Sequence, residues 1–213
     1  MCAASRGGQV AKNKPIAFVV RHGSTLLNAQ KCFRSWINAP LDAEGKVQAH
    51  EAADWLHDNA HLDEVWSSPL DRAVETARIC TDLPINQHSG LLGWHLGVFG
   101  GVARDMAQEA MELFIDNPHV AIPNGESLDS LEQRVADFVE PLLKDAEERG
   151  VTLGLFTHNS TLMAMDTLFK GMRDQHPELG SVVETGGIAC VFAEGDGYRL
   201  EACFKQTEQP QLS

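Results

Sequence analysis

Several features that define other protein classes are missing from this chain of 213 residues. No apolar run approaches the roughly 20 residues that a helix needs to cross a bilayer. Residues 1–14 lack the apolar core of a secretory signal. The sequence contains no P-loop, no Gly-x-Gly-x-x-Gly pattern, no metal-ligand spacing and no Gly-x-Ser-x-Gly elbow. These absences argue against membrane insertion, nucleotide binding and serine-hydrolase chemistry, and we expect neither a metal nor an organic cofactor.

Basic residues and paired cysteines are also scarce. Lys and Arg total 17 against 30 Asp and Glu, for a formal net charge of −13. This balance argues against non-specific binding to nucleic acids or membranes, and it means that any anion site must be positive locally. The five cysteines are odd in number and show no CxxC spacing. We therefore expect reduced, mostly buried thiols and a cytoplasmic location.

Composition and length favour a single domain. Apolar content of 43% and charged content of 22% are ordinary for a globular protein, and the chain is long enough to bury a core without disulfides. We expect a disordered leader at residues 1–14, one domain at 15–206 and a flexible tail at 207–213. The oligomeric state stays open, a dimer among the options.

Strands and helices are predicted to alternate along this domain. Apolar runs, helical spacing and turn residues predict strands at 16–20, 64–67, 152–157, 188–193 and 198–204, and helices at 43–57, about 69–80, 103–116, from 128 onward and after 160. Ser127 is the expected N-cap of the helix from 128. The irregular, glycine-rich stretch 83–101 is interpreted as a functional or covering loop. This order predicts an α/β fold: a three-layer sandwich with a mostly parallel sheet between helices.

The end of the first predicted strand carries the most informative residues. Arg21, His22 and Gly23 follow the apolar run 16–20. Ligands of open α/β sheets bind at the carboxyl ends of the strands. Arginine offers a planar fork of donors for phosphate, and histidine can act as a nucleophile. The pair indicates phosphoryl chemistry.

A second histidine and a second arginine stand in comparable places. His158 follows the strand at 152–157, and Arg72 begins the helix after the strand at 64–67. A lone His158 would be read as a capping or core histidine. If the strands are parallel neighbours, however, two histidines and two arginines converge on one rim of the sheet.

These motifs resemble the histidine phosphatase superfamily, which includes phosphoglycerate mutases and small phosphatases. The resemblance runs from about residue 16 to 204. It rests on the Arg-His-Gly at 21–23, Asn28, the Pro-Leu-x-x-x-Gly at 40–45, the Ser-Ser-x-Leu-x-Arg-Ala-x-x-Thr-Ala at 67–77, the Gly-Glu-Ser at 125–127, and His158. The resemblance implies a phosphoglycerate mutase-like fold and a small phosphorylated substrate or a phosphoprotein as partner.

The resemblance also implies roles for these residues. Neutral His22 would attack phosphorus and carry the phosphoryl group covalently. Arg21 and Arg72 would hold the equatorial oxygens, and protonated His158 would donate to the same oxygens. Three further residues are expected to contact substrate: Gly23 by letting the backbone approach the phosphate, together with Asn28 and Asn159.

One family feature is missing. Most relatives carry a glutamate in the middle loop that protonates the leaving group, and alignment places Gly93 there. No Asp or Glu lies between residues 83 and 104. Losing a general acid costs about 10²–10⁴ in rate when the leaving group is poor.

Three interpretations of the missing acid stay open. Another residue donates the proton: His95, or Glu126, Asp105 or Glu184 from outside the loop. Alternatively, the substrate needs little acid, as a phosphoramidate or acyl phosphate does. Finally, the chain is a weak or inactive member that binds phosphorylated ligands or a protein partner. We expect a phosphatase; mutase activity is a weaker alternative, because the loop 83–101 adds no Lys or Arg to hold a bisphosphate.

Overall fold

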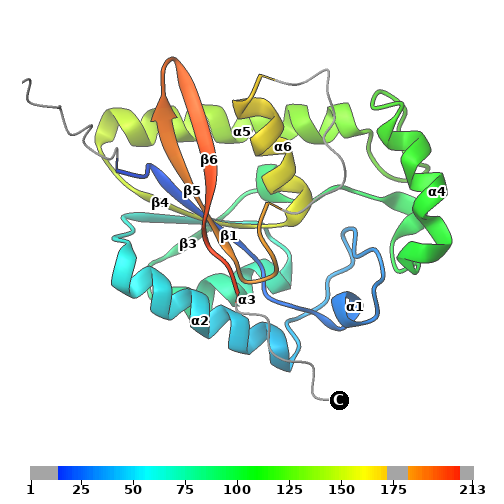
Figure 1. Ribbon diagram of the computed structural model, residues 1–213, viewed down its shortest axis with the longest axis horizontal. Helices are drawn as coiled ribbons and strands as arrows, with labels where there is room; N and C mark the ends of the chain where they lie inside the picture. Colours follow the sequence, from blue (N-terminus) through cyan, green and yellow to red (C-terminus); the bar gives the residue numbers. More distant parts are fainter. Residues whose placement is uncertain (1–13, 172–181, 207–213) are drawn as a thin grey trace, which may run out of the picture.

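A computed structural model describes residues 14–171 and 182–206 of the chain. The expected leader, apart from Lys14, and the expected tail therefore lie outside the described residues. One six-stranded sheet, in the order β3-β2-β4-β1-β5-β6, forms the centre of the molecule (Figure 1). Its strands are β1 (Ala17–Arg21), β2 (Glu64–Ser67), β3 (Ile85–Gln87), β4 (Leu153–Thr157), β5 (Ile188–Glu194) and β6 (Gly197–Phe204).

The strand pairing brings three carboxyl ends to one edge of the sheet. β1 and β4 are parallel with Arg21 opposite Thr157, and β2 and β4 are parallel with Ser67 opposite Phe156. β5 and β6 form an antiparallel hairpin, and β5 pairs antiparallel with β1. The side chains that follow β1, β2 and β4 are thus neighbours in space.

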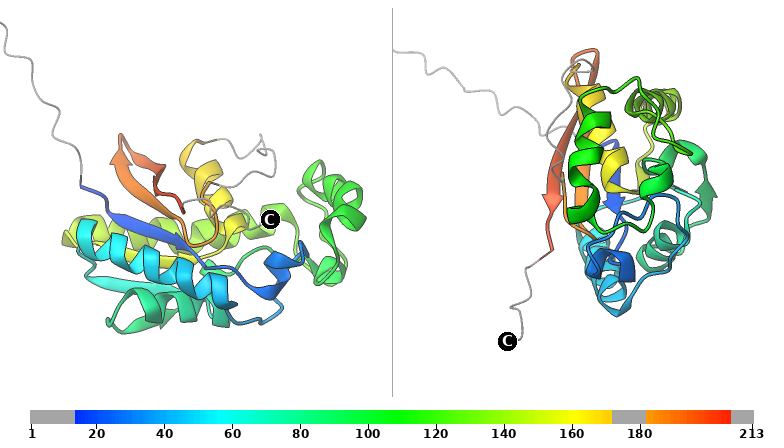
Figure 2. Two further views of the ribbon diagram at one scale, coloured as in Figure 1. Left: turned by 60° about the horizontal axis from the view of Figure 1, so that its bottom comes forward. Right: turned by 90° about the vertical axis from the view of Figure 1, so that its right-hand side faces the viewer.

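Helices cover both faces of the sheet, which confirms the three-layer sandwich (Figure 2). The helices are α1 (Leu26–Ala29), α2 (Ala43–Asn59), α3 (Asp71–Cys80), α4 (Arg104–Ile115), α5 (Leu128–Arg149) and α6 (Asn159–Phe169). β1 shows why both faces need cover, because all five of its residues are buried. Phe18 and Val20 pack with α2 and α3, whereas Ala17 and Val19 pack with α5 and α6. A strand buried on both faces reads as a continuous apolar run.

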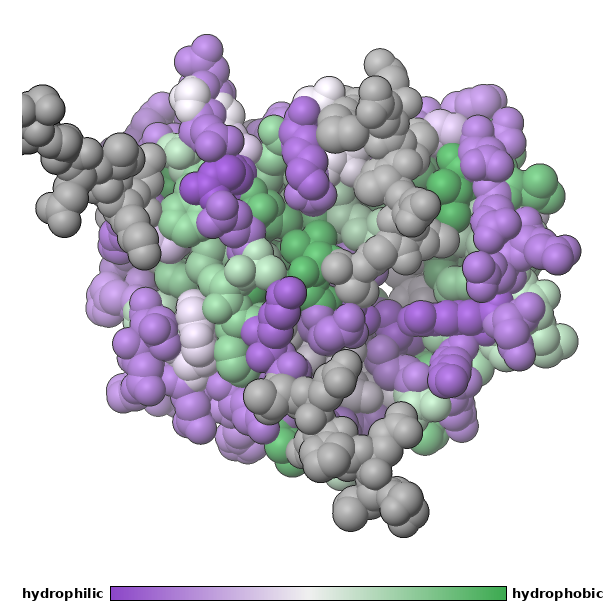
Figure 3. All heavy atoms as spheres, in the orientation of Figure 1, coloured by the Kyte–Doolittle hydropathy of each residue, from purple (hydrophilic) through white to green (hydrophobic). Residues whose placement is uncertain are grey.

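α4 lies beside the sandwich, at the right of Figure 1. It is joined to the rest by a bridge between Ala103 and Cys32 and by contact between the rings of Phe99 and Phe114. Met106 and Leu113 on this helix are exposed, at 81% and 63%. In Figure 3, apolar residues are visible at the right, around α4, whereas most of the rest of the outline is hydrophilic.

Two sequence expectations about elements need correction. Pro69 does not open α3, because Leu70 is the N-cap and Asp71 the first helical residue. The stretch 83–101 is not entirely irregular: it contains β3 and two short 3-10 helices, Ser89–Leu91 and Gly97–Phe99. β3 has three residues at the sheet edge, too few to produce a recognisable alternation. The expected cap at Ser127 is present, its hydroxyl accepting from the Ser130 N–H.

The expectation that all cysteines are reduced is wrong for two of them. Cys190 on β5 and Cys203 on β6 form a disulfide across the hairpin. Cys32 and Cys80 are free, and Cys2 lies outside the described residues. The pairing was invisible in the sequence because the two cysteines come together only through the strand register.

Within the described residues, no helix combines the length and apolar character needed to span a membrane.

Candidate active site

His22 follows β1 and is completely buried. Its Nδ1 lies 2.7 Å from the carbonyl oxygen of Gly23. A carbonyl only accepts, so Nδ1 carries the hydrogen and Nε2 carries the lone pair. Nε2 is buried without a hydrogen-bond partner among the described residues. Burial, followed by the charges of the nearby arginines and of His158, holds the pKa of His22 well below 6.5, so the ring is neutral.

His158 is the N-cap of α6 and lies beside His22, with ring centroids 5.1 Å apart. Its Nε2 is 2.7 Å from Ser68 Oγ, and its Nδ1 is buried without a partner among the described residues. Burial and the neighbouring arginines hold its pKa well below 6.5. Burial and the surrounding cations thus favour a neutral His158 here, and a protonated His158 acting on a bound phosphoryl group stays a prediction.

Arg21 and Arg72 approach the two histidines from β1 and α3. Arg21 donates to the carbonyl of Val183 at 2.8 Å and to Asn159 Oδ1 at 3.3 Å. Arg72 donates to the carbonyls of Ser35 and Ile37 at 2.9 and 2.8 Å, and its buried Nε has no partner among the described residues. Burial lowers the pKa of each guanidinium to about 10, so both remain charged at neutral pH.

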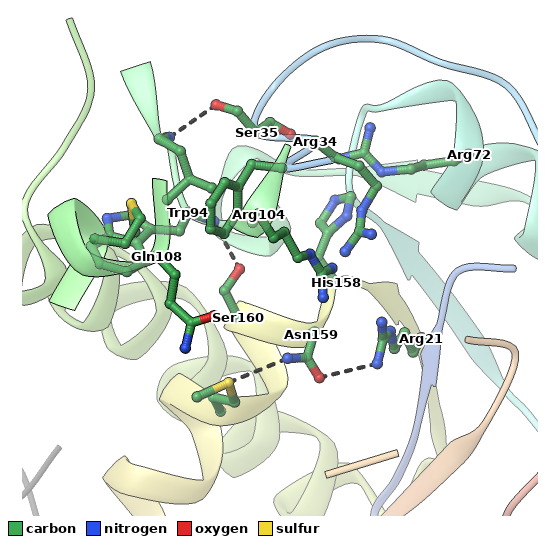
Figure 4. A pocket seen from close by; sticks show the side chains of 15 residues that line it. Arg21, Arg34, Ser35, Arg72, Trp94, Arg104, Gln108, His158, Asn159 and Ser160 are labelled. Atoms are coloured by element: carbon green, nitrogen blue, oxygen red, sulfur yellow. Dashed lines mark hydrogen bonds between the residues drawn. The ribbon is translucent and has the colours of Figure 1, made fainter. Parts of the chain in front are cut away.

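Arg21, Arg72 and His158 line a pocket of about 270 Å³ (Figure 4). His22 is fully buried beside His158 and is not among the lining residues. The pocket is lined by Arg21, Phe33, Arg34, Ser35, Arg72, Gly93, Trp94, Leu96, Arg104, Gln108, Met111, His158, Asn159, Ser160 and Met163. The described lining residues include four arginines and neither Asp nor Glu. The local positive charge expected of an anion site in this acidic protein is therefore found here.

Arg34 and Arg104 are the lining arginines that sequence reasoning did not assign to the site. Arg34 belongs to the loop after α1, and Arg104 is the first residue of α4. Burial lowers the pKa of Arg34 to about 9, with further lowering by Arg21, Arg72 and Arg104. Neither residue follows a strand, so the strand-end pattern could not find them.

Gly23 allows two backbone segments to pack closely, and its expected contact with the phosphate stays a prediction. A Cβ at Gly23 would lie 2.3 Å from the carbonyl oxygen of Gly45 in α2, and a Cβ at Gly45 would lie 2.0 Å from that of Ser24. The Gly23 N–H donates to Thr76 Oγ1 at 3.1 Å. The missing side chain therefore allows contact between two backbone segments, and the N–H of Gly23 is committed to Thr76.

The two asparagines differ in their relation to the pocket. Asn159 lines it and contacts Arg21. Asn28 is in α1, where its Oδ1 accepts from the N–H and the hydroxyl of Thr25 at 3.2 and 2.9 Å. Asn28 is not among the pocket-lining residues, so its contact with substrate stays a prediction.

The structure does not support His95 or Glu126 as the missing acid. His95 stacks on Trp36 with centroids 4.3 Å apart and does not line the pocket. Glu126 pairs with Arg134 at 2.7 Å and also accepts from the His95 N–H at 2.9 Å. Both of its carboxylate oxygens are occupied as acceptors, away from the pocket.

The remaining two candidates for a proton donor are exposed. Asp105 and Glu184 also do not line the pocket. Gly93, aligned with the family's glutamate, does line it. No carboxylic acid among the described residues therefore takes that glutamate's place.

Comparison with known proteins identifies the family of this chain. The sequence profile of the histidine phosphatase superfamily (branch 1) matches residues 17–205. The chain belongs to the histidine phosphatase superfamily. It is similar to phosphoglycerate mutase-like protein 4 of Arabidopsis thaliana, 28% identical over 193 residues that cover 86% of this chain and 82% of the relative. It is also similar to the fructose-2,6-bisphosphatase TIGAR of Bos taurus, 35% identical over 57% of this chain and 48% of the relative.

A solved structure confirms the fold. A mycobacterial glucosyl-3-phosphoglycerate phosphatase in complex with VO3 superposes with a TM-score of 0.75 at 23% identity, covering 90% of this chain and 98% of that protein. The fold is therefore phosphoglycerate mutase-like. Among the proteins that this chain resembles by sequence, some are named as mutases and others as phosphatases.

Proposed function

We propose that this protein is a phosphatase that forms a covalent phosphohistidine on His22. The observation that carries the proposal is a set of four buried polar atoms without partners among the described residues: His22 Nε2, His158 Nδ1, Arg34 Nη1 and Arg72 Nε. Buried polar groups are normally hydrogen-bonded, so unpartnered atoms of four adjoining residues indicate a site built for a ligand. The two guanidinium groups among them and a nucleophilic nitrogen favour a phosphorylated ligand.

The roles follow from the hydrogen bonds already described. Nε2 of His22 presents a lone pair to phosphorus because Nδ1 donates to the Gly23 carbonyl. With the Ser68 hydroxyl donating to Nε2 of His158, Nδ1 of His158 carries a hydrogen for a phosphoryl oxygen. Arg21 and Arg72 supply charge-assisted donors for the remaining equatorial oxygens. Water then attacks phosphorus, the N–P bond breaks, and its electron pair returns to Nε2.

Trapping the phosphorylated enzyme tests this function. The protein is mixed with 4-nitrophenyl phosphate, quenched in alkali and examined for phosphate on histidine, which is stable to base and labile to acid. We expect the adduct in the wild type and its loss in His22→Ala. His61→Ala is the matched control, because His61 is exposed, lies 3.5 Å from Asp63 and does not line the pocket. Absence of any phosphohistidine from this and from acyl phosphate donors would contradict the proposal.

A second candidate function is binding without turnover. The observation in its favour is the absence of Asp and Glu among the described pocket-lining residues. A binding protein would retain vanadate or phosphate at the same site but form no phosphohistidine. The trapping experiment therefore separates the two functions.

A further inference from the structure

One wall of the pocket is built from two loop segments that hydrogen-bond to each other. Ser35 Oγ accepts from the Leu96 N–H at 2.9 Å, and Trp36 Nε1 donates to the Gly93 carbonyl at 2.8 Å. The loop wall, as we name it, consists of the pocket-lining residues Phe33, Arg34, Ser35, Gly93, Trp94 and Leu96. It includes Gly93, which aligns with the glutamate that relatives use as acid. Its one charged side chain is that of Arg34.

Arg34 reaches from this wall toward the phosphoryl site. Its Nη1 is buried and has no partner among the described residues. Its charge lowers the pKa of both His22 and His158. Figure 4 shows Arg34 and Arg72 on one side of the pocket and Arg21 and Asn159 on the other. Arg34 thus adds a cation to a site where Arg21 and Arg72 already face the phosphoryl group.

We propose that Arg34 is a catalytic residue that stabilises negative charge on the departing oxygen, which this pocket does not protonate. The inference rests on the phosphatase function proposed above. Arg34 keeps its proton at neutral pH, because its pKa of about 9 lies above 7. It therefore acts as a hydrogen-bond donor and positive charge rather than as a general acid.

The chemical step balances without a proton donor. The lone pair of His22 Nε2 forms an N–P bond while the P–O bond to the leaving group breaks. That bond's electron pair stays on the leaving oxygen, which departs as an anion beside Arg34. Water then displaces the histidine and both its hydrogens remain with the product, so ROPO₃²⁻ and H₂O give RO⁻ and H₂PO₄⁻.

This chemistry selects a class of substrate. An oxygen that leaves as an anion must be weakly basic, as a phenolate is and a sugar alkoxide is not. Beside its arginines, His158 and four neutral polar residues, the pocket is lined by five large apolar side chains: Phe33, Trp94, Leu96, Met111 and Met163. An aromatic ring matches such surroundings. The pocket is therefore specific for aryl phosphates over sugar or other alkyl phosphates.

A series of phenyl phosphates with increasingly basic leaving groups tests the role of Arg34. The value of kcat/KM reports formation of the phosphoenzyme. It is measured for aryl phosphates that range from 2,4-dinitrophenyl phosphate to phenyl phosphate, and also for the alkyl ester glycerol phosphate. In the wild type it falls steeply as the leaving group becomes more basic. Arg34→Gln loses about 10²–10³-fold with phenyl phosphate and less than about tenfold with dinitrophenyl phosphate. Arg34→Lys, which keeps the charge, recovers part of the loss.

Arg104→Gln is the matched control, because it removes another pocket-lining arginine from outside the loop wall. It lowers kcat/KM by the same factor for every phosphate in the series. Thermal unfolding of each variant verifies that it is folded. If Arg34→Gln does not fold, the comparison is made with Arg34→Lys instead. An equal loss across the series in Arg34→Gln would place Arg34 on the phosphoryl group instead and overturn the inference.

The inference and the underlying function can fail separately. If phosphohistidine forms but wild-type kcat/KM is independent of leaving-group basicity, an acid exists and only the Arg34 inference is lost. Faster hydrolysis of glycerol phosphate than of phenyl phosphate would have the same meaning. If no phosphohistidine forms with any donor, the phosphatase function itself fails.

Discussion

At the scale of single residues, Gly93 links the missing acid to the second histidine. A Cβ at this position would lie 3.1 Å from Cβ and Cγ of His158 and from Ser160 Oγ. This is closer than ordinary contact between carbon atoms, which is optimal at about 3.5–4.0 Å. A side chain at this position would therefore require His158 or Ser160 to move by a few tenths of an ångström.

We predict that Gly93→Ala lowers kcat by about 10-fold to 100-fold, because small displacements of catalytic groups have large effects on rate. Steady-state kinetics with 4-nitrophenyl phosphate measure the change. Gly197→Ala is the control: it adds the same methyl group where no heavy atom lies within 4 Å, and it should leave kcat unaltered. Unchanged kcat in Gly93→Ala would mean that His158 moves freely without loss of function.

At the scale of elements, α5 holds the loop that carries Gly93. Arg134 on this helix donates to the carbonyls of Ser89, Leu92 and Gly93 at 2.9, 3.0 and 3.2 Å. Glu126, just before the helix, fixes the same guanidinium. The Glu126 carboxylate, which the sequence suggested as a proton donor, is therefore a structural partner: it contacts Arg134, and Arg134 in turn contacts the pocket-lining Gly93.

We predict that Glu126→Gln lowers the free energy of unfolding by about 2 kcal/mol, because hydrogen bonds to a charged group are lost. Thermal unfolding should show a fall in Tm of about 4–8 °C. The pH dependence of kcat should keep its shape, since Glu126 transfers no proton to the substrate. Glu109→Gln on α4 removes an exposed carboxylate and should alter neither quantity. A lost limb in the Glu126→Gln profile would restore this residue as the acid.

At the scale of the whole molecule, a net charge of −13 surrounds a cationic, partly buried site. His22 and His158 stay neutral there because burial and the arginines disfavour their charged forms. In the unfolded chain both would titrate near 6.5. Below that pH the unfolded state binds more protons than the folded state, so the free energy of unfolding decreases as the pH is lowered.

We predict that the ligand-free protein loses thermal stability as pH falls from about 7 to about 5, and that His22→Asn loses less. The difference between the wild type and this variant reports the contribution of His22, including its interaction with His158. Bound orthovanadate counteracts the arginine charges; at 100 times its Kd it adds about 2.7 kcal/mol of stability. Thermal unfolding across this pH range, with and without vanadate, measures both effects. Identical pH dependence of the two proteins would show that His22 titrates normally when folded.

The sequence by itself determined most of the strands and helices, though not the short β3 and α1, and where the chemistry begins. Residues 16–20 are apolar because β1 is buried on both faces, and the following Arg21 and His22 are recognisable as a strand-end pair. Such patterns are local: period and end signals depend on residues a few positions apart. The same locality made the cap at Ser127 predictable.

Only the tertiary structure decided which distant residues meet. It paired Glu126 with Arg134, joined Cys190 to Cys203, set Gly23 against Gly45, and brought Arg34 to the two imidazoles. Each outcome depends on how loops pack on the finished sheet and on the register of its strands. No local pattern contains that information, because these contacts form between surfaces that exist only after the chain has folded.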